Sequence, residues 1–380
     1  WEVEAVWDEQ ELSAVPADFA AKAQRATKVT FIKNKFTTFP AEVLGLRAVV
    51  ELSLAENELS SLPDEIGNMA QLENLDVSEN KLTSLPNGIC KLSNLKMLTA
   101  FKNELTSLPE GIGALQAMVE INIFNNKVES LPASIGRMGS LEMLNVASNK
   151  LASVPDLSGL KNLKRLALFW NKISDLPALE HMKDLEELQL SKNTINELPS
   201  LQGLTALKSI SINNNNLKAL PASIGTCSAL EEVAASSNQI SELPDTMKDM
   251  PELSKVVVSQ NKIATIPASL LEVKTMATLD FADNALTEIP AAVGTLDSLT
   301  NLFVQGNQIT KLPPSLSGLS GMKRVTLTGN PLDKEDDDTT AVLAALKGFC
   351  EGNKGKFQGA EPEAGGGGGL RKFGFGKKKK

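Results

Sequence analysis

The stretch Leu72-Glu-Asn-Leu75-Asp-Val77-Ser-Glu-Asn80-Lys-Leu82-Thr-Ser-Leu85-Pro86-Asn-Gly-Ile89 contains one short strand and one return path. Leu75 and Val77 alternate with polar residues, which is the period of a strand with one buried face. After Asn80 the alternation stops, and Leu85-Pro86 predicts extended or turn backbone, because proline disfavours helix in the residue before it. A unit of this length cannot enclose its own apolar residues, so it must stack on similar units.

The asparagine at position 80 has equivalents along almost the whole chain. The spacing between them is 23 residues five times, 22 residues three times and 23 residues five times again. This regularity predicts a solenoid with about 14 short parallel strands on its concave face and mostly irregular or short helical segments on its convex side. The asparagines are Asn34, Asn57, Asn80, Asn103, Asn126, Asn149, Asn171, Asn193, Asn215, Asn238, Asn261, Asn284, Asn307 and Asn330.

These asparagines are interpreted as structural. A carboxamide both donates and accepts hydrogen bonds, so a ladder of them can satisfy backbone groups where each strand ends. Each buried group left unpaired would cost about 1–3 kcal/mol. We assign Asn57 through Asn307 of this series to a structural ladder and not to a ligand site.

The units carry a family resemblance over about residues 29–332. Leu59-Ser-Ser-Leu-Pro63-Asp-Glu-Ile-Gly67 and Val128-Glu-Ser-Leu-Pro132-Ala-Ser-Ile-Gly136 fit the unit LxxLxLxxNxLxxLPxxIGxL. The chain therefore resembles intracellular leucine-rich-repeat proteins of the Ras-group-related class. The resemblance implies an α/β fold, a right-handed horseshoe solenoid, and a non-catalytic scaffold or adaptor in intracellular signalling. It also implies a Ras-type small GTPase as one candidate partner.

Three central units are one residue shorter. They read Val154-Pro155-Asp-Leu157-Ser-Gly-Leu160, Leu176-Pro177-Ala-Leu179-Glu-His-Met182 and Leu198-Pro199-Ser-Leu201-Gln-Gly-Leu204. These units resemble the 22-residue class found in a regulatory subunit of protein phosphatase one. A protein phosphatase catalytic subunit is therefore the second candidate partner that the resemblance implies.

Both ends of a solenoid expose core and need caps. Residues 1–28, with Trp7 and Phe19, are interpreted as an N-terminal cap or degenerate repeat. At residues 333–350 we expect a capping helix, because Asp336-Asp-Asp-Thr-Thr340 is a helix-start signal before an alanine-leucine run.

Residues 351–380 are expected to form a flexible glycine-rich linker with a basic tail. Eight basic and three acidic residues give this segment +5, which leaves −13 for the other residues from a total of −8. Lys377, Lys378, Lys379 and Lys380 are candidates for weak contact with an anionic membrane surface, worth about 1 kcal/mol per basic residue. Nuclear import, contact with an acidic partner, and a solvated tail without a role are the alternatives.

Few residues indicate chemistry. His181 is the single histidine and three cysteines are scattered, so the sequence supports no metal site, cofactor or catalytic triad. Gly365–Gly369 is followed by Leu370-Arg371, which is not a phosphate loop. We expect no enzymatic activity. No apolar run is long enough to cross a membrane, and the expected location is the cytoplasm, with the nucleus and the periphery of a membrane left open by the basic tail.

Function is expected on the concave face, at the residues six, four, two and one before each ladder asparagine and one after it. Phe101 and Phe124 occupy the same position in adjacent repeats, and Phe169 returns to it two repeats later. Aligned apolar side chains rimmed with charge are typical of interfaces. The predicted partner-binding residues are Glu56, Glu79, Phe101, Lys102, Phe124, Asn125, Arg165, Phe169 and Trp170. The alternative is that neighbouring side chains cover these rings or that they are tolerated surface.

The sequence therefore favours a protein partner. An acidic rim around the aromatics would suit a partner with basic and apolar features, and it disfavours nucleic acid on the concave face. A recognition receptor for a carbohydrate or another polar ligand, bound at Asn213, Asn214 or Ser236, is one alternative. An architectural protein anchored by its basic tail is the other.

Overall fold

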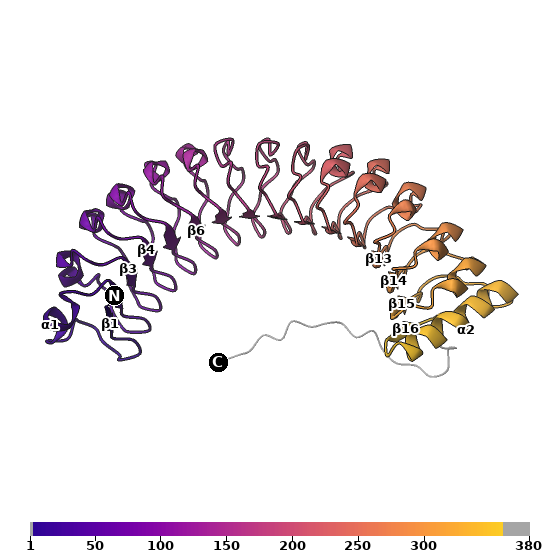
Figure 1. Cartoon of the computed structure of the whole chain (residues 1–380), viewed down its shortest axis with the longest axis horizontal. Coiled ribbons are helices and arrows are strands. Elements are labelled where there is room, and N and C mark those ends of the chain that lie inside the picture. Colours follow the sequence, from indigo (N-terminus) through magenta and orange to yellow (C-terminus); the bar gives the residue numbers. More distant parts are fainter. Residues whose placement is uncertain (1–2, 360–380) are drawn as a thin grey trace.

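One long parallel sheet forms the inner side of an arc (Figure 1) in the computed structural model, which describes residues 3–359. Sixteen strands of three residues follow one another in chain order, each paired with the next. The predicted leucine-rich-repeat solenoid is confirmed, with two more strands than expected because the sheet extends beyond the regular repeats at both ends. The strands are β1 (Glu4–Val6), β2 (Lys28–Thr30), β3 (Glu51–Ser53), β4 (Asn74–Asp76), β5 (Met97–Thr99), β6 (Glu120–Asn122), β7 (Met143–Asn145), β8 (Arg165–Ala167), β9 (Glu187–Gln189), β10 (Ser209–Ser211), β11 (Glu232–Ala234), β12 (Lys255–Val257), β13 (Thr278–Asp280), β14 (Asn301–Phe303), β15 (Arg324–Thr326) and β16 (Lys356–Gln358).

Short 3₁₀ helices lie on the outer side of the arc (Figure 1). Nine of them have a proline at the position before the first helical residue, where extended backbone is required. The three shorter units, between β7 and β10, have turns in place of these helices. The helices are η1 (Ala41–Gly45), η2 (Asp64–Asn68), η3 (Asn87–Lys91), η4 (Ile112–Ala114), η5 (Ala133–Arg137), η6 (Ala222–Thr226), η7 (Asp245–Asp249), η8 (Ala268–Glu272), η9 (Ala291–Thr295) and η10 (Pro314–Gly318).

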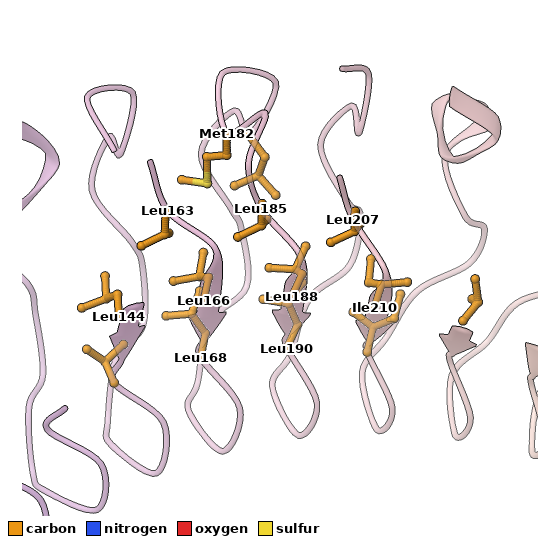
Figure 2. Close-up of a cluster of buried hydrophobic side chains, with 14 of the residues drawn as sticks. Leu144, Leu163, Leu166, Leu168, Met182, Leu185, Leu188, Leu190, Leu207 and Ile210 are labelled. Atoms are coloured by element: carbon orange, nitrogen blue, oxygen red, sulfur yellow. The ribbon is translucent and has the colours of Figure 1, made fainter. Parts of the chain in front are cut away.

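The core is a continuous stack of aliphatic side chains between strands and convex segments. The middle residue of each strand points inward, and Leu144 lies in register between Ile121 and Leu166, all three essentially inaccessible to solvent. Figure 2 shows this stack continuing through Leu188 and Ile210. Each repeat therefore buries its apolar residues only against its neighbours.

The ladder asparagines join successive repeats through their side chains. Asn126 Nδ2 donates to the carbonyl oxygens of Ala100 (2.9 Å), Ile123 (3.1 Å) and Phe124 (3.4 Å). The amide N–H of Leu105, in the preceding repeat, donates to Asn126 Oδ1 (2.9 Å). The same geometry recurs along the solenoid, so each carboxamide satisfies backbone groups at the strand-end turn of two repeats.

An aromatic cluster closes the N-terminal end. Trp7 stacks on Phe31 with ring centroids 5.1 Å apart, and Phe19 of α1 (Phe19–Ala23) lies 5.2 Å from Trp7. Strand β1 pairs with β2, so this segment forms a turn of the solenoid and not a separate lid.

At the other end, α2 (Asp337–Gly352) packs over the last repeat (Figure 1). Strand β16 then pairs with β15. Strand β16 lies within residues 351–380, where the sequence predicted a flexible linker. Regular secondary structure therefore continues beyond residue 350. The sequence signal was weak because Lys356-Phe-Gln358 is too short to show alternation. The basic tail at Lys377–Lys380 lies outside the described residues.

Asp336 anchors the start of α2 by an ion pair and a helix cap. Its carboxylate lies 2.7 Å from Lys311 Nζ and accepts hydrogen bonds from the Thr339 N–H (2.9 Å) and hydroxyl (2.8 Å). The hydrogen bond from Lys311 and those from Thr339 lower the pKa of Asp336 from 3.8 to about 2.

A lowered folded-state pKa means that this carboxylate stabilises the fold above its unfolded-state value of 3.8. The contribution is lost as the pH falls toward 2. We expect Asp336→Ala to lower the melting temperature at pH 6, with a difference from wild type that shrinks as the pH approaches 2. Circular dichroism melts of both proteins across this range test the prediction, and an equal difference at both ends would contradict it.

Candidate functional site

The turn before each ladder asparagine has a left-handed backbone in all fourteen repeats. The residue immediately before the asparagine has φ between +51° and +71° throughout. We number the concave columns from the ladder asparagine, so this residue is in column −1. Such backbone favours glycine, asparagine and other small or polar residues, and the column is otherwise composed of these and of charged residues. Trp170 is the one aromatic in it, with φ +56°.

Column −2 holds a pair of aromatic rings in contact. The centroids of Phe124 and Phe169 are 6.2 Å apart with the planes tilted by 43°. The repeat between them has Ala147 at this position, and that residue has no exposed surface. Because alanine leaves room above it, the two rings reach across an intervening strand and both remain half-buried.

Trp170 follows Phe169 directly in the chain, in column −1. It is 53% exposed, the largest such fraction among the exposed large hydrophobic residues of the described chain. Lys192 Nζ, from column −1 of the next repeat, lies 4.2 Å from the indole centroid, a cation–π distance. We call Phe124, Phe169 and Trp170 the aromatic patch.

Phe101 is separate from the aromatic patch. It occupies column −2 in the repeat before Phe124, yet no ring contact joins the two within residues 3–359. Its cationic neighbour is Lys102, whose Nζ lies 5.9 Å from the ring centroid. The structure therefore brings Phe124 and Phe169 into contact, with Trp170 next to Phe169 in the chain, and leaves Phe101 as an isolated half-buried ring.

Several carboxylates of the early repeats are paired with lysines of the following repeat. Lys102 Nζ lies 3.1 Å from Glu79, which occupies the same column in the preceding repeat. Two pairs of the same kind lie in column +1, where Lys81 pairs with Glu58 at 2.7 Å and Lys127 with Glu104 at 2.8 Å. Hydrogen bonds from these lysines lower the pKa of Glu58 and of Glu104. Three carboxylates at this edge, Glu58, Glu79 and Glu104, are therefore neutralised by lysines of the following repeat. Of the other predicted site residues, Glu56, Asn125 and Arg165 are exposed on the concave side.

A polar hollow of about 350 Å³ begins at Phe169 and runs over strands β9 to β11. Its side chains already bond to one another. Asn213 Oδ1 accepts from the Ser236 N–H (2.7 Å), Asn213 Nδ2 donates to Ser211 Oγ (3.3 Å), and Ser191 and Ser211 share a hydroxyl hydrogen bond of 2.8 Å. Much of the hydrogen-bonding capacity proposed for a polar ligand is thus used within the protein.

Two concave residues were missed in the sequence analysis. Met97 is 38% exposed beside a second hollow of about 280 Å³ over β2 to β5. Phe303 lies beneath Arg324, whose guanidinium carbon is 5.7 Å from the ring centroid. Both could have been found, since they stand six and four residues before a ladder asparagine.

His181 and Cys227 lie on the convex side and in the core, away from the aromatic patch. His181 Nε2 hydrogen-bonds the carbonyl oxygen of Leu157 (3.0 Å), and burial raises the pKa of the Cys227 thiol to about 11. No group of three or more His, Cys, Asp or Glu side chains within residues 3–359 has metal-site geometry. Over the same residues, no helix has the length and hydropathy to span a bilayer.

Comparison with known proteins agrees with this geometry. Residues 46–127 match the family model of a leucine-rich repeat region. A leucine-rich-repeat protein of Leptospira interrogans is 28% identical, with a TM-score of 0.75 over 92% of this chain and 95% of that chain. The chain has the leucine-rich-repeat fold.

Two further solved structures are similar to this leucine-rich-repeat solenoid. The plant peptide hormone receptor RGFR1, in complex with RGF2, is 22% identical, with a TM-score of 0.75 over 90% of this chain and 61% of the receptor. The Toll–Spätzle complex of Drosophila gives 21% identity, a TM-score of 0.75, and coverage of 88% of this chain and 48% of that one. These likenesses concern the fold, and both neighbours are bound to a protein or peptide. A search of curated protein sequences gave no match.

Proposed function

We propose that this leucine-rich-repeat solenoid is a non-catalytic protein-binding scaffold or adaptor, and that the aromatic patch is its interface. The observation that supports this most directly is the contact of Phe124 with Phe169 across Ala147, together with the exposed ring of Trp170, the residue that follows Phe169. A contiguous apolar patch of this kind marks interfaces more often than tolerated surface, and aromatic residues dominate measured binding energies.

The backbone at Trp170 supports this proposal. A bulky residue in left-handed backbone costs about 1–2 kcal/mol relative to ordinary conformations. An exposed indole recovers little of that cost by packing, so the fold does not require tryptophan here. A bulky residue at a strained position, where the fold does not need it, points to function.

The proposal also includes a location in the cell and two candidate partners. We place the protein in intracellular signalling in the cytoplasm, on the basis of its repeat classes. A Ras-type small GTPase and a protein phosphatase catalytic subunit are the candidates to assay first. Recognition of a carbohydrate at Asn213 is less favoured, because its carboxamide is held by Ser211 and Ser236.

Affinity capture with matched variants tests the interface. The test variant is Phe124→Ala, Phe169→Ala, Trp170→Gly. The control is Phe303→Ala, Gln260→Gly, which removes another concave ring and changes another left-handed position, since Gln260 also has φ +56°. Both variants should keep the wild-type melting curve.

Native cell extract is passed over each protein and the retained proteins are identified by mass spectrometry. We expect wild type and control to retain a protein that the patch variant loses. Identical protein sets for all three would contradict the proposal and move the interface to another surface.

A further inference from the structure

We propose that the partner segment that docks on the aromatic patch is acidic, an extended stretch of protein with carboxylates beside at least one apolar side chain. This rests on the proposed function and adds the chemistry of the partner. It reverses the preference for a basic partner that the acidic rim suggested.

The first observation is a break in the charge pattern along one edge of the concave face. Columns −2, −1 and +1 contain no aspartate or glutamate over seven consecutive repeats, whereas the whole chain carries −8. Among the twenty-one positions, five are lysines. The positions are Phe124, Asn125, Lys127, Ala147, Ser148, Lys150, Phe169, Trp170, Lys172, Ser191, Lys192, Thr194, Asn213, Asn214, Asn216, Ser236, Ser237, Gln239, Ser259, Gln260 and Lys262.

The second observation is the pairing of these lysines. Lys127 pairs back to Glu104 in the preceding repeat, as Lys81 pairs with Glu58. Lys150 and Lys172 occupy the same column +1, yet within residues 3–359 neither forms an ion pair.

Lysines in successive repeats of one column repel one another. Adjacent parallel strands are about 5 Å apart, and like charges on neighbouring strands are destabilising. The run Lys127, Lys150, Lys172 therefore does not serve the fold. A ligand with carboxylates would provide the ion-pair partners that Lys150 and Lys172 do not have in the neighbouring repeats.

The third observation places the charge against the rings. Lys192 Nζ lies over Trp170 at 4.2 Å, and it too forms no ion pair in the described part of the chain. A carboxylate that approaches Lys192 would bring its neighbouring side chains onto the indole. The charge of Lys192 and the apolar surface of Trp170 can therefore contact the same short segment of a partner.

The opposite edge of the concave face limits the class of ligand. Glu120 begins β6, the strand that precedes Phe124, and Glu187 begins β9, the strand paired with the one that precedes Phe169 and Trp170. A nucleic acid backbone needs a continuous run of cations, and these carboxylates would repel it. A peptide can place its own acidic residues along the lysine edge alone.

A peptide-display selection on the full chain tests the proposal. Random twelve-residue peptides are selected on wild type at low salt, and the most enriched peptide is synthesised with a fluorescent label. Its affinity is measured for three proteins. One is wild type, one is Lys150→Glu, Lys172→Glu, Lys192→Glu, and one is a control with Lys91→Glu, Lys183→Glu, Lys248→Glu. The control lysines are exposed outside the three columns and receive the same change in charge.

We expect enriched peptides that combine Asp or Glu with apolar residues, and binding at least about tenfold weaker to the lysine-edge variant, since several charge pairs are reversed together. The control should bind as wild type does, and added salt should weaken binding. Basic or uncharged peptides that bind the patch would overturn the acidic preference and leave the proposed function standing.

Peptides that bind equally to the patch variant Phe124→Ala, Phe169→Ala, Trp170→Gly would instead contradict the proposed function. An absence of any enriched peptide would overturn the inference. A labelled twenty-nucleotide poly-uridine is measured in parallel. Tighter binding of this RNA than of the selected peptide, weakened by the lysine-edge changes, would assign the edge to nucleic acid.

Discussion

Replacing Leu144 with aspartate is expected to lower the free energy of unfolding by about 4 kcal/mol or more, the range of severe core substitutions. Leu144 has no exposed surface and lies in register between Ile121 and Leu166. An aspartate there would place an unpaired charge in an aliphatic stack, where burial is very costly. Urea denaturation followed by circular dichroism measures the loss.

The same substitution tests the one-dimensional character of the fold. Since each repeat packs only on its neighbours, hydrogen exchange should rise first at β6 to β8 and less at distant repeats. Asn145→Asp is the matched control, because it adds the same charge one residue away, where the side chain accepts the Ala147 N–H (3.2 Å) and is partly exposed. Exchange that rises uniformly along the chain would refute this description.

Replacing Asn126 with alanine is expected to lower the free energy of unfolding by about 3 kcal/mol or more, because each orphaned buried group costs about 1–3 kcal/mol. The side chain donates to three carbonyl oxygens and accepts one N–H at 2.9–3.4 Å. Alanine would leave the Leu105 N–H without an acceptor and the Ala100 carbonyl without this donor.

Asn125→Gly is the control for the asparagine substitution. Asn125 is the adjacent residue, is exposed, and has φ +57°, which glycine adopts freely. Its replacement should change the free energy of unfolding by less than about 1 kcal/mol, as expected for a surface site. Equal effects of the two substitutions in urea denaturation would mean that the ladder does not hold the repeats together.

The repeat architecture could be predicted from the sequence because its determinants recur in every unit. The alternation around Leu75 predicts which face is buried, and the spacing from Asn80 to its equivalents predicts which strands become neighbours. The ends were harder to predict. β16 lacks the repeat pattern, and its place in the sheet depends on α2 returning the chain to β15.

The site was predictable only in part, because its character depends on pairwise contacts. Column positions predicted that Phe124, Phe169 and Trp170 lie on the concave face, but the reach of the two phenylalanine rings over Ala147 is a property of side-chain packing. The formal charges of single residues also gave an incomplete description of the concave face. Glu79 was interpreted as part of an acidic rim, whereas in the structure it is neutralised by Lys102 at 3.1 Å.

The left-handed backbone of column −1 had no clear sequence signal. Its residues are chemically diverse, and only Gly306 and Gly329 are glycines, the type that adopts such backbone without strain. The conformation follows from the hydrogen bonds of the ladder asparagine, which fix the preceding turn in every repeat. These hydrogen bonds explain how a tryptophan can be held in left-handed backbone at position 170.

Titration calorimetry of the captured partner against Trp170→Gly tests the central proposal most directly. Glycine removes the indole and relieves the left-handed strain, so the fold should be at least as stable. We expect binding weaker by about 2 kcal/mol or more, roughly thirtyfold in Kd, as for an aromatic hot spot. The control Gln260→Gly, at φ +56° in the same column, should bind as wild type does. Unchanged affinity for Trp170→Gly would contradict the assignment of the aromatic patch as the interface.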